Sequence, residues 1–84
     1  MNAGTKKTEF PLNLLKKGQT AIILKVGGQG AIKRRMMDMG LVKGAEIKMV
    51  RVAPFGDPME FNIKGYNLSL RKNEAAEILV KPVE

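Results

Sequence analysis

Residues 32–44 read IKRRMMDMGLVKG, and this stretch decides the fold because it predicts a short basic helix, a glycine stop and a turn into a strand. Three apolar residues with i, i+4 and i+7 spacing share one helical face: Ile32, Met36 and Met39. Gly40 stands where the helix must end, at a position that commonly takes a positive φ. Leu41 is then expected to fold back onto Met36, as in a Schellman cap. Gly44 suits a turn before the next strand.

The remaining pattern predicts about five short strands around this helix, which spans about 31–39. Strands are expected over 21–26, 45–53, 59–64, a partner segment carrying Leu68 and Leu70, and 77–80. The last of these is expected to pair with the first and close the sheet. Five strands, one helix and tight turns favour a small barrel of the SH3-like or OB type over a helical bundle. Residues 1–10 are polar and read as a flexible tail, with a single domain over 11–82.

Four local features refine this prediction. In the first strand, Ile22, Leu24 and Val26 are expected inside, with Ile23 outside but covered. The apolar alternation of 45–53 slips at Val50, which predicts a β-bulge or bend. Phe55 is expected to form a lid over one barrel end, with an exposed contact as the alternative. Gly65-Tyr66 reads as a type II′ hairpin turn with glycine first.

The composition argues against enzymes and transition-metal proteins. Among 84 residues there is no histidine and no cysteine, which removes the commonest general base and the usual nitrogen and sulfur ligands. The glycine loop 27–30 lacks the spacing of a nucleotide-binding motif and reads as a turn. We therefore expect no catalytic residues, no metal site, no cofactor and no small-molecule substrate.

The formal charge is +7, and part of it gathers on the predicted helix. Lys33 and Arg34 are expected to face water, while Arg35 lies nearer the apolar face and suits a fork to a carboxylate. Met37 points away from the core face, where an exposed methionine beside arginines is typical of an adaptable protein-binding surface. Such a basic domain favours an anionic partner.

The sequence also resembles a known family. IKRRMMDMGLVKGAEIKMVRVAPFGDP, over 32–58, is similar to the central signature of FeoA proteins, and GYNLSLR, over 65–71, is similar to their closing segment. The likeness extends over about 12–81. This resemblance implies an SH3-like barrel. It also implies that six residues have structural roles in turns, helix caps or salt links: Gly40, Gly44, Asp57, Pro58, Gly65 and Arg71.

The resemblance further implies a small cytoplasmic accessory or regulatory protein of ferrous iron uptake, which docks on the GTPase-bearing cytoplasmic part of the FeoB permease. Our candidate docking residues are Lys33, Arg34, Arg35, Met37 and Phe55. Proximity to anionic lipid around a permease is also compatible with the charge.

Two alternatives stay open at this stage. A nucleic-acid-binding barrel would suit the charge, but the four aromatic residues do not interleave with the basic cluster as a stacking platform requires. A carboxylate-based metal-sensing module, related to the C-terminal domain of DtxR-type repressors, is the second alternative.

Overall fold

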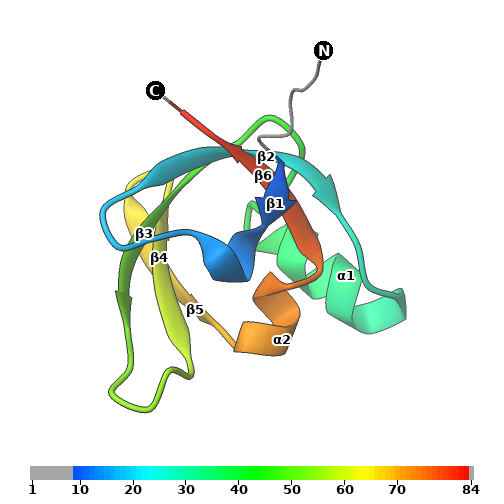
Figure 1. Ribbon diagram of the computed structural model, residues 1–84. Coiled ribbons are helices and arrows are strands. Elements are labelled where there is room, and N and C mark those ends of the chain that lie inside the picture. The colour runs from blue at the N-terminus through cyan, green and yellow to red at the C-terminus, as the bar shows by residue number, and fades with distance from the viewer. Residues whose placement is uncertain (1–8, 84) are drawn as a thin grey trace.

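The computed structural model describes residues 9–83 as one six-stranded antiparallel sheet with short helical segments (Figure 1). The strand order is β1-β6-β2-β3-β4-β5. In chain order the elements are β1 (Phe10–Pro11), η2 (Leu12–Leu14), β2 (Thr20–Val26), α1 (Gly30–Asp38), β3 (Glu46–Val52), β4 (Met59–Ile63), β5 (Tyr66–Leu70), α2 (Lys72–Ala75) and β6 (Ile78–Pro82). The mainly β fold with one helix between the first two long strands is as predicted.

The sheet curls around one core without closing by strand pairing. The expected pairing of the last strand with the first long strand is present, because β6 lies antiparallel to β2. β1 and β5 are the two edges, and within residues 9–83 no ladder joins them. Strand β1 was not predicted: Phe10, which was expected in the flexible tail, pairs with Val80. The rest of that tail, residues 1–8, lies outside the described residues.

The predicted facing of β2 was wrong. Ala21 and Ile23 are fully buried, whereas Ile22 and Leu24 are only half-buried. The reason is a bulge: Ile23 pairs with Val80 and Lys25 with Leu79, so Leu24 is the extra residue. A bulge shifts the side-chain alternation by one position. Counting back from the buried Val26 in steps of two therefore selected the wrong face.

A second bulge, in β3, was predicted. The pairing with β4 shifts between Met49 and Arg51, which leaves Val50 as the inserted residue. Met49 before it is buried, as expected. Val52, which follows the bulge, is 42% exposed.

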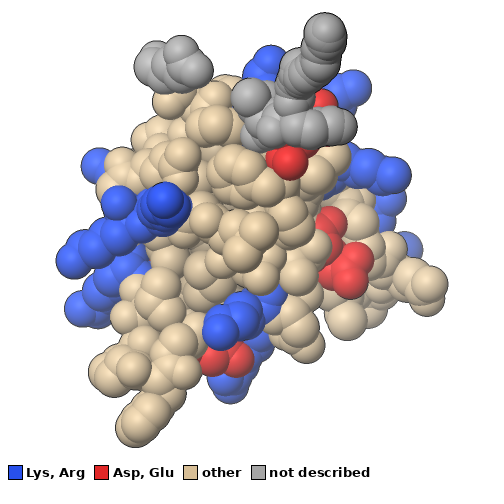
Figure 2. All heavy atoms as spheres, in the orientation of Figure 1, with Lys and Arg blue, Asp and Glu red and all other residues tan. Residues whose placement is uncertain are grey.

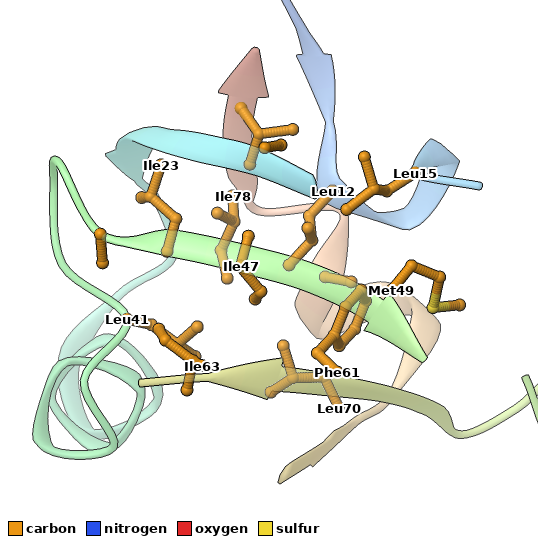
Figure 3. Close-up of a cluster of buried hydrophobic side chains, with 14 of the residues drawn as sticks. Leu12, Leu15, Ile23, Leu41, Ile47, Met49, Phe61, Ile63, Leu70 and Ile78 are labelled. Carbon is orange, nitrogen blue, oxygen red and sulfur yellow. The ribbon is translucent and has the colours of Figure 1, made fainter. Parts of the chain in front are cut away.

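The core lies inside the curled sheet and is apolar throughout. Phe61, Ile47 and Met49 from β3 and β4 point toward Ile23 and Ile78 from the opposite side of the sheet (Figure 3). Leu12, the first residue of η2, and Leu15, which follows η2, complete the cluster beside Met49 and Phe61. Each such side chain contributes roughly 1.5–3 kcal/mol when fully buried, so this cluster is the main stabilising element of the sheet.

Helix α1 ends in the predicted Schellman motif. The Leu41 N–H donates to the Met36 carbonyl at 3.1 Å, and the Gly40 N–H donates to the Met37 carbonyl at 3.0 Å. Gly40 has φ +96°, which only glycine adopts readily. Met36 and Leu41 are fully buried and seat the helix on the core. Ile32, predicted on the same apolar face, is 51% exposed because the helix buries only its last turn.

The β4–β5 hairpin turns one residue earlier than predicted. Ile63 pairs with Tyr66, so the loop is Lys64-Gly65. Both loop residues have positive φ, +52° and +89°, which is the type I′ geometry and not type II′. Within residues 9–83, no helix combines the length and the apolar character that crossing a membrane requires.

Candidate partner-binding surface

One face of α1 is free of the core and carries three of the predicted docking residues. Lys33, Arg34 and Met37 are all exposed, the methionine by 45%. Together with Gly30 and Asp38 they border a shallow hollow of about 450 Å³. This placement confirms the prediction, made from the helical period, that these side chains point away from the core.

A second hollow, of about 410 Å³, lies between α1 and the end of β2. Lys33 and Met37 border this hollow as well as the first, so the two are neighbours. We call the second hollow the α1 groove, and its lining residues are Leu24, Lys25, Val26, Lys33, Met37, Val42 and Lys43. Its walls come from three segments that are distant in sequence: β2, α1 and the turn after Gly40.

The groove combines an apolar floor with a cationic rim. Leu24, Val26, Met37 and Val42 supply apolar surface, and the cations are Lys25, Lys33 and Lys43. None of the described carboxylates lines it. The ion pairs among the described residues join Arg35 to Glu74, Arg51 to Glu60 and Arg71 to Asp57, so none neutralises the groove lysines. Basic side chains also gather along both flanks of the molecule, including the flank of α1 (Figure 2).

Arg35 does not line either hollow, and its side chain instead links α1 to α2. Its Nη2 lies 2.5 Å from Glu74 Oε2, which is the carboxylate contact that the sequence predicted for it. Glu74 Oε1 in turn accepts the Arg71 N–H at 2.8 Å. The contact that Arg35 makes in this fold therefore links α1 to α2.

Phe55 is not a lid. Its side chain is 98% exposed at the tip of the β3–β4 loop, which projects away from α1 in Figure 1. Two backbone bonds fix the loop: the Ala53 N–H donates to the Pro58 carbonyl at 3.0 Å, and the Gly56 N–H donates to the Ala53 carbonyl at 2.7 Å. These bonds extend the hairpin outward, while Leu12 and Leu15 cover the core instead. The structure thus does not bring Phe55 together with the α1 residues.

The motif residues implied by the family resemblance lie in turns. Asp57 Oδ1 accepts the Lys72 N–H at 2.9 Å, which ties the β3–β4 loop to the start of α2. Arg71 Nη1 lies 3.8 Å from Asp57 Oδ2. Gly44 and Gly65 both have positive φ. These contacts position loops and leave the groove untouched.

Sequence reasoning missed the groove itself. Lys25 and Lys43 are single lysines in their segments, and Leu24 was assigned to the core. The available signal was the glycine stop at Gly40, which reverses the chain so that the following residues return beside β2. Within residues 9–83 no group of three or more histidine, cysteine, aspartate or glutamate side chains is placed to hold a metal ion.

Comparisons with known proteins give one consistent family. The sequence model of the FeoA domain matches residues 10–82. A Fe(2+) transport protein A/Fe(2+) transporter FeoB fusion protein of Porphyromonas gingivalis is 41% identical over 70 residues, which are 83% of this chain and 8% of that protein. The chain therefore spans a small part of that relative.

Solved structures agree on the fold. The FeoA protein from Chlorobium tepidum superposes with TM-score 0.85 at 44% identity, covering 89% of this chain and 71% of that one. Stenotrophomonas maltophilia FeoA complexed with zinc, described as a prokaryotic SH3 domain protein, has TM-score 0.77 and 30% identity over 86% of this chain and 89% of that one. T. acidophilum IdeR, at 20% identity and TM-score 0.81 over 93% of this chain and 36% of that one, shares the fold.

Proposed function

The chain belongs to the FeoA family, and from this premise we propose that it is a small accessory protein of ferrous iron uptake that binds the cytoplasmic GTPase region of a FeoB-type permease. The observation that carries the proposal is the exposed α1 face, with its unneutralised cations and a half-exposed methionine. The P. gingivalis relative, which joins a FeoA-type segment to FeoB in one protein, supports this choice of partner.

The α1 face has the chemistry of a recognition surface. Lys33 and Arg34 supply charge, which raises the rate of encounter with an acidic partner face. Met37 supplies a flexible, polarisable contact that adapts to the partner. Rim charges of this kind set association rate and orientation more than affinity, so Met37 is expected to supply a larger share of the binding free energy.

The other two candidate docking residues, Arg35 and Phe55, do not belong to this exposed face of α1. Arg35 positions α1 through Glu74 and acts on the partner only indirectly. Phe55 is a separate, second contact, because its loop projects away from α1. Phenylalanine is among the aromatic residue types that are enriched at protein–protein interfaces.

The test is calorimetric titration of the soluble cytoplasmic region of the FeoB from the same organism with this chain. The double variant Lys33→Glu/Arg34→Glu should weaken binding at least tenfold, since both charges are reversed at the contact. The matched control is Lys16→Glu/Lys17→Glu, which makes the same charge change on an exposed loop at the opposite side of Figure 1 from α1. Equal losses in both variants would indicate a general charge effect and contradict docking through α1.

Nucleic-acid binding has less support from the surface. Phe55 and Tyr66 are the exposed aromatic residues of the described chain, and neither lines the α1 groove. The Tyr66 hydroxyl donates to the Met39 carbonyl, so that ring is already engaged with the end of α1. Single strands need aromatic platforms along the basic surface. We therefore assign the cationic face to a protein partner.

A further inference from the structure

We propose that the α1 groove binds an extended acidic segment of the partner, which adds alongside the open edge of β2 and seats an apolar side chain on Met37. This inference rests on the proposed function and specifies what the partner presents. It follows from three independent properties of the groove: an unpaired strand edge, an apolar floor and a carboxylate-free cationic rim.

The strand edge is open because β2 loses one neighbour halfway along. It pairs with β3 only from Thr20 to Ile22. The Ile23 N–H then donates to the Ala45 carbonyl at 2.9 Å, and the Ile23 carbonyl accepts the Gly44 N–H at 2.7 Å. Within residues 9–83, β6 is the only strand paired with β2 beyond Ile23, and this pairing extends to Val26. Leu24, Lys25 and Val26 line the α1 groove, and within residues 9–83 no strand pairs with the β3 side of this segment.

An open edge beside a hollow is suited to strand addition. An extended peptide that pairs with a sheet edge gains main-chain hydrogen bonds, and pockets for alternate side chains supply its specificity. Folded proteins protect such edges with bulges and lysines against unwanted pairing. The Leu24 bulge and Lys25 are at this position. The lysine charge favours an acidic strand over a neutral or basic one.

The floor of the groove provides a seat for one apolar side chain. Met37 is 45% exposed, and Leu24 and Val42 are half-buried. These residues come from three different segments and line a single hollow of about 410 Å³. The unbranched methionine reshapes around an incoming group. A segment with one aliphatic residue between acidic residues would cover this surface.

The rim sets the charge of the segment. Lys25, Lys33 and Lys43 surround the floor, and no carboxylate is among the lining residues. The adjacent hollow adds Arg34 against a single carboxylate, Asp38. A basic or neutral segment would leave these cations without partners, whereas glutamate or aspartate at alternate positions would face them. An acidic peptide is thus the complementary occupant.

The experiment uses synthetic peptides and the full chain. Overlapping twelve-residue peptides covering the soluble FeoB region, and a designed peptide of alternating glutamate and valine, are titrated by fluorescence anisotropy and by amide NMR. We expect the acidic peptides to bind and to shift the amides of Leu24, Lys25 and Val42. Lys25→Glu/Lys43→Glu should weaken them about tenfold, while Lys16→Glu/Lys17→Glu should leave them within threefold.

Backbone methylation separates strand addition from simple charge attraction. Methylating alternate peptide nitrogens blocks pairing only when the methylated set faces β2, so one of the two methylated sets should lose at least tenfold in affinity and the other should not. Equal affinity of both methylated peptides would overturn strand addition. Tighter binding of a twelve-nucleotide single strand at the same amides would overturn the choice of a protein segment. If the whole FeoB region binds but no peptide does, this inference fails while the proposed function stands.

Discussion

Replacing Gly40 by alanine tests the link between the helix cap and the sheet. Gly40 has φ +96°, and placing a side chain in left-handed backbone costs roughly 1–2 kcal/mol. An added Cβ would also lie 3.1 Å from the Tyr66 hydroxyl, which is the group that donates to the Met39 carbonyl. Displacing that hydroxyl weakens a bond of roughly 0.5–1.5 kcal/mol. Together these two effects give a loss of about 1.5–3.5 kcal/mol.

A loss of this size is measurable in a domain of this length. One kcal/mol shifts the melting temperature of a 60–100-residue domain by about 4–8 °C, so Gly40→Ala should lower the melting temperature by about 6–28 °C. The assay is urea and thermal unfolding followed by far-ultraviolet circular dichroism, because the chain has no tryptophan for fluorescence.

Gly44→Ala is the matched control. Gly44 also has positive φ, +91°, but an added Cβ would meet no atom of residues 9–83 within 4 Å. It should therefore show the backbone cost alone, about 1–2 kcal/mol. Tyr66→Phe, which removes the hydroxyl, should shrink the difference between the two alanine variants. A change near zero for Gly40→Ala would refute the cap, and equal changes at both glycines would refute the contribution of Tyr66.

Three further predictions concern loops and helix ends. Phe55→Ser should change the free energy of unfolding by less than about 0.5 kcal/mol, because the side chain is exposed; a loss above 1 kcal/mol in urea unfolding would show an unseen packing role. Asp57→Ala should cost about 1 kcal/mol by removing the acceptor of the Lys72 N–H, whereas Asp57→Asn keeps an acceptor oxygen and should cost less; equal losses would argue against this bond. Glu74→Gln should cost about 0.2–1 kcal/mol, since Arg35 is exposed, and 1 M salt should reduce the difference from the parent protein.

Local signals predicted the parts of the fold that depend on neighbours in sequence. The end of α1 followed from Gly40 because the Schellman motif is built from consecutive residues. The β3 bulge followed from the slip in alternation at Val50. These features need no knowledge of which strands pair.

Features that depend on distant pairing were missed. The two-residue strand β1 exists only because Phe10 meets Val80. The prediction of which β2 side chains face the core was wrong because the Leu24 bulge depends on pairing with β6. The strand has apolar side chains on both faces, so its sequence did not indicate which face is buried. The observed hairpin loop begins one residue earlier than the predicted one because Lys64 adopts a positive φ.

The candidate site was predictable as single residues and not as a surface. Helical spacing is enough to expose Lys33, Arg34 and Met37. The groove needs the chain reversal that brings Val42 and Lys43 beside β2, which is a tertiary event. Phe55 was misjudged as a lid because an apolar residue at a turn reads the same in sequence whether it folds inward or projects.

The most direct test of recognition through α1 is an amide NMR titration of this chain with the soluble FeoB region. We predict shifts centred on Lys25, Lys33 and Met37 that saturate at one equivalent. Shifts confined to the outer face of β3 and β4, or no shifts at several equivalents, would contradict docking through this surface.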